Sequence, residues 1–290
     1  MNGVPIGTSF LQMKGNRMRI TVLVENTAME PLRCEHGLSL FIEFQGENYL
    51  LDAGTTDLFL ENAKRLDVPV YDVKTCILSH GHYDHSGGFG TYLSENKEAV
   101  LYMMEHADEE YLSGKGELHE IGIPKEVIER HRERFHFINQ VTRLAENVYL
   151  VPHHSEGMEQ IGRRAKLYKM VDGELMPDDF KHELSLVLDT EKGLVICNSC
   201  SHGGVKNIVS EVQERFPGKT LYAFVGGLHM KGGEFSEEEI RGVAEYLKSK
   251  EIQYLYTGHC TGEAAFQILK KYGGDMVQDL MTGKVIDICQ

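Results

Sequence analysis

Four potential metal ligands crowd into one turn of the segment TCILSHGHYDHSGGFG, residues 75–90. His80 and His82 follow a short apolar run, and because side chains alternate along an extended segment they point to the same side. The turn before the glycine pair then presents Asp84 and His85 next to them. Neutral imidazole and carboxylate groups suit Zn²⁺, Fe and Mn²⁺. The spacing predicts two divalent metal ions close together, with zinc expected first and manganese or iron as alternatives, and not a solvated loop that is merely rich in histidine.

Composition and charge narrow the range of partners. The chain has 290 residues, of which 41% are hydrophobic and 26% charged, as in a soluble globular protein with a large core. Its net charge of −14 argues against nucleic acid as the main partner, because proteins bind a phosphate backbone through Lys and Arg. Bound cations would still attract small anionic substrates. No apolar run is long enough to span a membrane, and residues 1–20 contain no signal-peptide core, so we expect a cytoplasmic protein.

The order of strand-like and helix-like segments predicts one α/β domain over residues 1–290. Apolar, β-branched runs predict strands, two of them in a hairpin around the turn QGEN, and the later part of the chain alternates between helix and strand. The polar stretch 105–140 is different: we expect a helical cap inserted into the domain, able to cover a neighbouring subunit in a homo-oligomer. The expected strands are 18–26, 38–54, 74–79, 99–103, 147–154, 183–200, 220–227 and 252–258, and the expected helices are 55–67, 124–135, 205–216, 236–250 and 262–273.

The segment SHGHYDHSGG resembles the signature of the metallo-β-lactamase fold superfamily. The resemblance implies an αββα sandwich, in which two mixed β-sheets carry helices on both outer faces. LLDAG looks like an early strand of that fold, whose aspartate, here Asp52, supports the metal loop from behind. The segments EHGLSLFIEFQGENYLLDAG, SCSHGG, GGLHM and TGHCTGE are, in that order, similar to a branch of metal-dependent hydrolases. This branch is named after 7,8-dihydropterin-6-methyl-4-(β-D-ribofuranosyl)aminobenzene 5′-phosphate synthase.

The resemblance also implies that distant segments complete the metal site. His259, at the end of a strand in YTGHC, corresponds to the last metal-ligand histidine of the fold, although it could instead cap the following helix. Cys200 occupies the place where the superfamily usually has a bridging aspartate, and a thiolate suits Zn²⁺ or Fe. His202, two residues later, is either the ligand in place of Cys200 or a proton donor to the leaving group.

A third ligand for the first ion is expected in VYLVPHHSEG, where His153 and His154 are both candidates and a polar exposed loop is the alternative. His229 in GGLHM closes a strand and is interpreted as a residue that faces the substrate. His36 and His182 are interpreted as hydrogen-bonded structural histidines near the mouth of the pocket. The remaining cysteines are interpreted as buried strand residues or ordinary thiols: Cys34, Cys76, Cys197, Cys260 and Cys289.

These residues favour a metal-dependent hydrolase. Two cations would activate a hydroxide that attacks a small, anionic substrate such as a phosphate ester or phosphodiester, with Asp84 orienting the nucleophile and His202 or His229 assisting the leaving oxygen. The alternative enzyme is an iron-dependent oxidoreductase of the sulfur dioxygenase type, which uses the same fold. A non-catalytic structural metal site is the third hypothesis, but the glycines around the cluster favour an open pocket.

Overall fold

The computed structural model describes residues 18–114, 116–231 and 235–288. Most of residues 1–20, for which no signal peptide was expected, lies outside these ranges, and Cys289 lies outside them as well.

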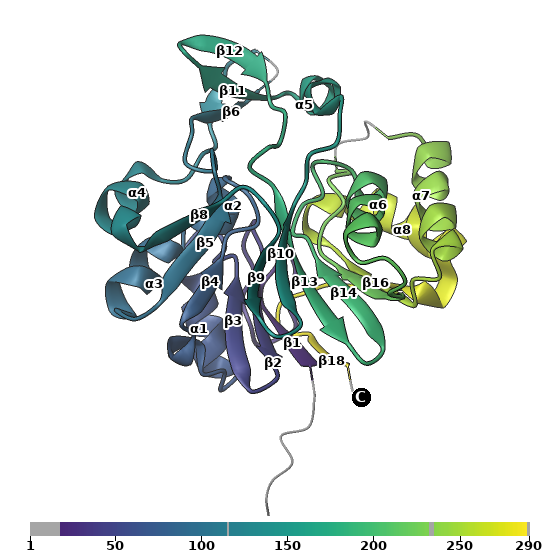
Figure 1. Ribbon diagram of the computed structural model, residues 1–290, viewed down its shortest axis with the longest axis horizontal. Helices are drawn as coiled ribbons and strands as arrows, with labels where there is room; N and C mark the ends of the chain where they lie inside the picture. Colours follow the sequence, from purple (N-terminus) through teal and green to yellow (C-terminus); the bar gives the residue numbers. More distant parts are fainter. Residues whose placement is uncertain (1–17, 115, 232–234, 289–290) are drawn as a thin grey trace, which may run out of the picture.

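Among the described residues, two seven-stranded sheets stand face to face (Figure 1). The first sheet has the order β18 (Val285–Ile288), β1 (Met18–Val24), β2 (Ser39–Phe44), β3 (Glu47–Leu51), β4 (Thr75–Ile77), β5 (Val100–Met104), β8 (Phe135–Ile138). The second has the order β17 (Val277–Asp279), β16 (Tyr254–Thr257), β15 (Leu221–Val225), β14 (Gly193–Cys197), β13 (Leu184–Thr190), β10 (Val148–Pro152), β9 (Thr142–Ala145).

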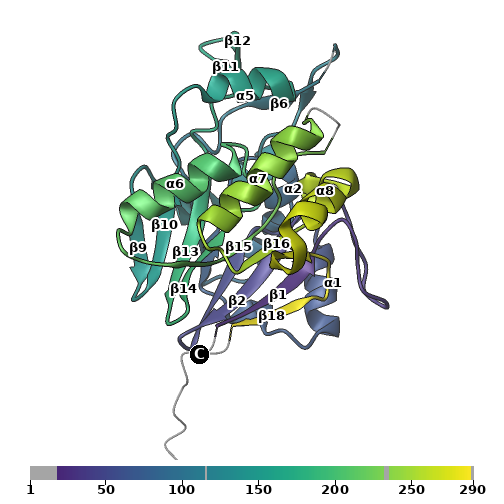
Figure 2. The ribbon, with the colours of Figure 1, turned by 90° about the vertical axis from the view of Figure 1, so that its right-hand side faces the viewer.

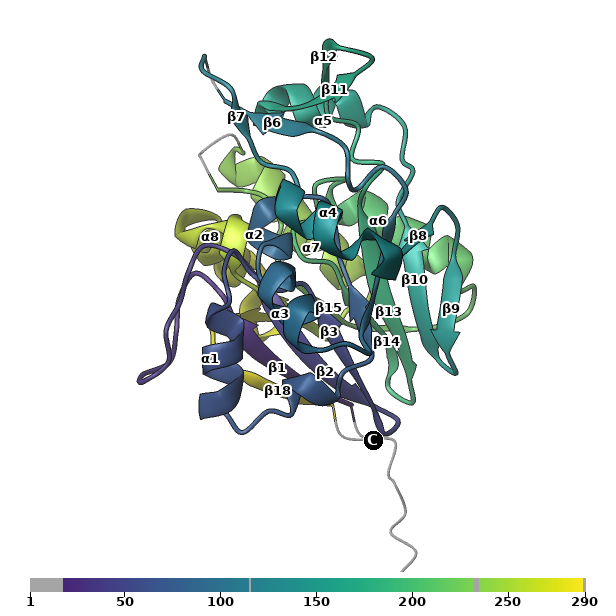
Figure 3. The ribbon, with the colours of Figure 1, turned by 90° about the vertical axis from the view of Figure 1, so that its left-hand side faces the viewer.

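Helices cover the outer face of each sheet, which confirms the αββα sandwich. The first sheet is covered by α1 (Leu58–Arg65), α3 (Phe89–Glu95) and α4 (Lys125–His131), as Figure 3 shows. The second sheet is covered by α6 (Val205–Arg215), α7 (Glu237–Ser249) and α8 (Glu263–Gly273), as Figure 2 shows. Shorter helical turns are α2 (Tyr83–Ser86), η1 (Val70–Asp72), η2 (Arg132–Arg134), η3 (His259–Thr261) and η4 (Gly274–Met276).

Local sequence explains the elements that position the site. Central strands such as β14, GLVIC, are buried along their whole length because one face meets the other sheet and the other face meets helices. The predicted β2–β3 hairpin turns at Gln45 and Gly46, whose φ angles of 52° and 84° are those of a type I′ turn. Helix α7 begins with a capping box, in which the Ser236 side chain and the Glu239 backbone and carboxylate exchange hydrogen bonds.

Both sheets are mixed, and their parallel strands end at one shared edge. In the first sheet β3, β4 and β5 are parallel, and in the second β14, β15 and β16 are parallel. The loops that follow the carboxyl ends of parallel strands lie side by side, and such an edge is where α/β proteins bind ligands. The histidine-rich loop follows β4, so the topology places it at this edge.

The expected helical cap at 105–140 differs from the structure. In residues 105–114 and 116–140, which the structure describes, α4 is the one α-helix, and the last strand, β8, is part of the first main sheet. The part of the molecule that projects is instead a small sheet, at the top of Figure 1, and helix α5 (Met158–Ala165) lies beside it. Its strands come from two separate segments, β12 (Glu174–Pro177) and β11 (Leu167–Val171) from one and β6 (Tyr111–Ser113) and β7 (His119–Glu120) from the other. No helix in the described ranges has the length and apolar character needed to cross a bilayer.

Candidate metal centre

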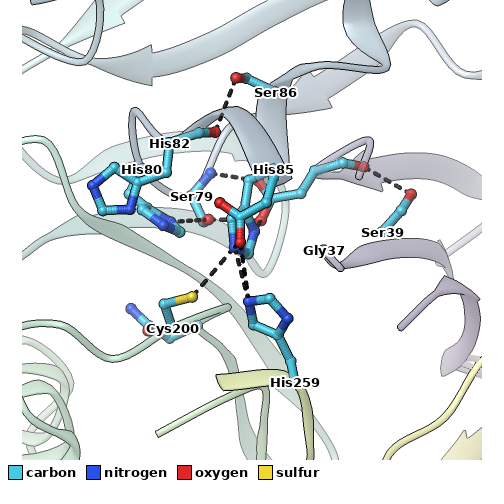
Figure 4. Close-up of polar contacts among 12 residues, drawn as sticks. Gly37, Ser39, Ser79, His80, His82, His85, Ser86, Cys200 and His259 are labelled. Atoms are coloured by element: carbon cyan, nitrogen blue, oxygen red, sulfur yellow. Dashed lines mark hydrogen bonds and ion pairs between the residues drawn. The ribbon is translucent and has the colours of Figure 1, made fainter. Parts of the chain in front are cut away.

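The predicted metal ligands occupy loops at the shared edge of the two sheets (Figure 4). Four residues of these loops have a left-handed backbone although none is glycine: Asp52, Ser201, His229 and His259, with φ of 60°, 52°, 48° and 49°. Each such residue costs roughly 1–2 kcal/mol, and such strain concentrates at functional sites. The concentration of strained residues in these loops indicates that the fold holds their side chains in place against a local cost.

Three buried imidazoles form the first half of the centre. Ligand atoms of His80, His82 and His202 all lie within 4.8 Å of one another. Within the described part of the chain, Nε2 of His80, Nε2 of His82 and both ring nitrogens of His202 are buried without a hydrogen-bond partner. Buried polar atoms are almost always paired, so this arrangement fits a cation that accepts three nitrogen ligands. Ser79 Oγ contacts His80 Nδ1 at 2.8 Å and so turns Nε2 of that ring toward the group.

The second half of the centre gathers around His85. Its Nε2 is 3.2 Å from His259 Nε2 and 3.2 Å from Cys200 Sγ, and Figure 4 shows both side chains pointing toward it from separate segments. The Asp84 carboxylate lies 3.5 Å from the same nitrogen of His85 and 3.5 Å from that of His259. A carboxylate, an imidazole and a thiol gathered around the His85 ring are, with that ring, a donor set that fits Zn²⁺ or Fe.

Outer hydrogen bonds orient these side chains. The buried Asp52 carboxylate accepts hydrogen bonds from Ser79 N at 2.7 Å and Ser79 Oγ at 2.6 Å, and it contacts His85 Nδ1 at 2.7 Å. Asp52 therefore lies behind the ligand loop, where the sequence resemblance expects it. Asn26 Oδ1 contacts His259 Nδ1 at 2.9 Å, and the Glu25 carboxylate accepts a short hydrogen bond from the His259 backbone N–H. Sequence analysis did not identify Glu25 and Asn26 as site residues, because they read only as the polar end of a strand.

Burial and neighbouring charges set the protonation of the centre. Burial lowers the pKa of His80 well below its ordinary 6.5 and lowers the pKa of His82 to about 3. Burial alone would raise the pKa of Asp84, but His85 beside it holds that pKa well below its usual range. Burial opposes charge on His85 as well, yet Asp84 and Asp52 raise its pKa to about 10. At neutral pH the first two rings therefore offer neutral nitrogens, and a cation bound by His85 would displace a proton.

His202 lies with His80 and His82, while the structure does not bring His153 or His154 to the centre. The ring nitrogens of His153 contact Glu211 and Ser185, each at 2.7 Å, and His154 is exposed. His153 follows β10, which the intervening strand β13 separates from β14, so it lies roughly 10 Å along the sheet edge from the Cys200 loop. The third ligand expected at His153 or His154 therefore disagrees with the strand order of the second sheet.

Other histidines frame the centre. His36 lies half exposed at its mouth, with Nε2 3.2 Å from Asp84 Oδ2. His182 accepts a hydrogen bond from the Gly81 backbone N–H at 2.9 Å and contacts Asp178 at 3.1 Å, so it is a hydrogen-bonded histidine that supports the loop. The ring of His229 lies 4.2 Å from that of His202, and its Nδ1 is buried without a partner among the described residues.

Two cavities meet at His202 and His229, which line both. The first, of about 240 Å³, is bordered by candidate metal ligands and by Lys231. The second, of about 320 Å³, lies between α5, α6 and α7, and its lining is mostly apolar but includes Lys206 at the start of α6. An open space next to the donor groups distinguishes this centre from a structural zinc site, in which protein ligands occupy every position.

Comparison with known proteins identifies the family of the chain. Residues 32–165 match the family model of the metallo-β-lactamase superfamily. The 7,8-dihydropterin-6-methyl-4-(β-D-ribofuranosyl)-aminobenzene-5′-phosphate synthase of Methanocaldococcus jannaschii is 30% identical, over 94% of this chain and 97% of its own length. The solved structure of Tm1679, a metal-dependent hydrolase of the beta-lactamase superfamily, is 28% identical and superposes with a TM-score of 0.81, covering 94% of this chain and 100% of its own. Zn²⁺-bound PqqB from Methylobacterium extorquens shares the fold at 12% identity and a TM-score of 0.53, covering 93% of this chain and 100% of its own. The chain belongs to the metallo-β-lactamase superfamily.

Proposed function

We propose that this protein is a metal-dependent hydrolase that uses a dinuclear centre on a small anionic substrate, of which a phosphate ester or phosphodiester is the first candidate. The observation that carries the proposal is a set of buried imidazole nitrogens, on His80, His82 and His202, that have no hydrogen-bond partner among the described residues. They lie next to the group of Asp84, His85, His259 and Cys200. The similarity to a metal-dependent hydrolase along nearly the whole chain supports the same reaction class.

Divalent ions bound by these side chains would lower the pKa of a water molecule and stabilise negative charge on a substrate oxygen. The chain's own residues fix where this happens. Asp52 and Asn26 hold the rings of His85 and His259 so that Nε2 of each faces the centre. Asp84 contacts both of those nitrogens and borders the open cavity, so its carboxylate is placed to orient an attacking water. His229 Nδ1 is buried at the junction of the two cavities and has no hydrogen-bond partner in the described part of the chain, so it can donate a proton to a leaving oxygen there.

The cavity lining supports an anionic substrate with an apolar part. Lys231 borders the cavity of the metal-binding groups and supplies a positive charge there. In the second cavity, Lys206 lies in the first turn of α6, whose N-cap, Gly204, provides no side-chain cap, so the positive end of the helix dipole faces the space. Leu228, Val243 and the ring of Phe235 form apolar walls of the same cavity. A substrate that spans both cavities would place its scissile bond near His202 and His229.

The test uses the purified protein loaded separately with Zn²⁺, Mn²⁺ or Fe²⁺, and a chelator-treated sample, assayed with bis(p-nitrophenyl) phosphate and p-nitrophenyl phosphate. We expect metal-dependent hydrolysis of at least one ester, and a loss of at least about 100-fold in His82→Ala, because a ligand of the first ion is removed. His153→Ala is the matched control, since that ring is tied to Glu211 and Ser185, and it should retain activity. Undiminished turnover by His82→Ala would refute the proposal.

A further inference from the structure

Cys260 lies inside the metal centre, although sequence analysis interpreted it as an ordinary thiol. Its Sγ is 3.4 Å from Cys200 Sγ, and both side chains are nearly inaccessible, with exposed fractions of 6% and 3%. Ligand atoms of Cys200, Cys260 and His259 lie within 4.8 Å of one another. Two sulfurs bound at about 2.3 Å to one tetrahedral Zn²⁺ are roughly 3.8 Å apart, so a small adjustment of the pair would let both bind one ion.

The surrounding backbone is built around the Cys260 sulfur. The His229 backbone N–H donates a hydrogen bond to Sγ at 3.3 Å, an interaction that stabilises a sulfur with negative charge. A Cβ on Gly227 would lie 2.4 Å from the same Sγ, so only glycine leaves room for it. The Lys231 backbone N–H donates to the Cys260 carbonyl at 2.9 Å and ties the loop after β15 to the loop after β16. These contacts fix the thiol at the centre rather than in an apolar core.

We propose that Cys260 is a second sulfur ligand of the second ion, which Cys200, Cys260 and His259 hold together, with His85 and Asp84 beside them. Each thiol would release its proton to solvent when the ion binds. Two thiolates favour a soft or borderline ion such as Zn²⁺ or Fe²⁺ over Mn²⁺ or Mg²⁺, whose preferred ligands are oxygens. The proposal rests on the metal centre of the proposed function but not on the reaction that the centre performs.

The main test is the electronic spectrum of the Co²⁺-loaded protein, in which sulfur-to-cobalt charge-transfer absorption reports bound thiolates. We expect Cys260→Ser and Cys200→Ser each to lose about half of this absorption, with Zn²⁺ affinity lowered at least about tenfold in a competition with a chromophoric chelator. Cys197→Ser is the matched control, because Cys197 is a fully buried thiol of β14 outside all of the candidate ligand groups of the described residues. An unchanged spectrum and affinity in Cys260→Ser would overturn the proposal.

A second measurement on the unmodified chain covers the case in which a variant does not fold. Zn²⁺ should protect both Cys200 and Cys260 from alkylation by iodoacetamide, as read by mass spectrometry, while the exposed Cys34 reacts equally with and without the metal. Protection of Cys200 without protection of Cys260 would show a single thiolate and refute the inference. Loss of ester hydrolysis with an intact two-thiolate spectrum would contradict only the proposed function.

Discussion

Replacing Asp52 with alanine removes one carboxylate that serves three buried contacts. Ser79 N, Ser79 Oγ and His85 Nδ1 all lie within 2.7 Å of it, and the Asp52 side chain is inaccessible to solvent. Each buried donor that loses its acceptor lowers the stability by roughly 1–3 kcal/mol. Because water that enters the vacated space would restore part of this, the loss of the three contacts together should lower the unfolding free energy by about 3–5 kcal/mol. Alanine at φ of 60° adds about 1 kcal/mol of backbone strain.

The expected loss of unfolding free energy is therefore about 4–6 kcal/mol, measured by urea denaturation in the presence of chelator. With an m-value of roughly 3 kcal/mol/M, the midpoint would fall by about 1.3–2 M. Metal affinity should also fall about 10–100-fold, because the His85 ring loses the contact that orients it. Asp189→Asn, which breaks the partly exposed pair with Lys219, is the control and should cost under about 1 kcal/mol. Equal effects of the two substitutions would refute the role assigned to Asp52.

Three further predictions concern other parts of the chain. His153→Ala should bind as much zinc as the unmodified protein in elemental analysis, whereas His82→Ala should bind less; equal losses would contradict the strand-order argument. Ser236→Ala should lower the unfolding free energy by about 1 kcal/mol, since it removes the capping box of α7, and an unchanged urea midpoint would count against that cap. Asp179 is partly buried, which alone would raise its pKa, but hydrogen bonds from Lys169 and Lys181 outweigh this and lower the pKa below 3.8. Its ionised form therefore stabilises the fold above the unfolded-state pKa, so the stability difference between the unmodified protein and Asp179→Asn should be constant above about pH 4 and shrink as pH falls below it. A difference that grows in acid would reverse the assigned sign.

The structure agrees with sequence-based prediction where the signal is local. The loop with the candidate ligands His80, His82, Asp84 and His85 could be identified because these residues are neighbours in the chain, and a short loop after a strand leaves their side chains few possible directions. The β2–β3 hairpin and the alternating helices and strands after residue 205 were predictable for the same reason, because turn residues and hydrophobic periodicity can be recognised in short stretches of sequence. Asp52 could be assigned only through resemblance to a family, because its partner His85 is 33 positions away.

The remaining candidate ligands come together through the order of the strands in the sheets, which a short stretch of sequence does not determine. Sequence analysis expected a third ligand at His153 or His154, and the structure brings His202 to that group because β14 lies closer to the centre of its sheet than β10 does. The projecting sheet likewise joins residues 111–120 with residues 167–177, which are far apart in the sequence. The charged composition of residues 105–140 therefore suggested a helical cap where the structure has this sheet.

The sequence by itself determined the chemistry that is available: imidazoles, carboxylates and thiols at the ends of apolar strands, in a chain that forms layered sheets and helices. Tertiary structure alone decided which of those groups meet, including the contact between Cys200 and Cys260, which are separated by 60 positions. The physical reason is that a ligand set is defined by distances of a few ångströms between side chains. Those distances follow from how long strands pair and pack, and this pairing is a property of the whole fold.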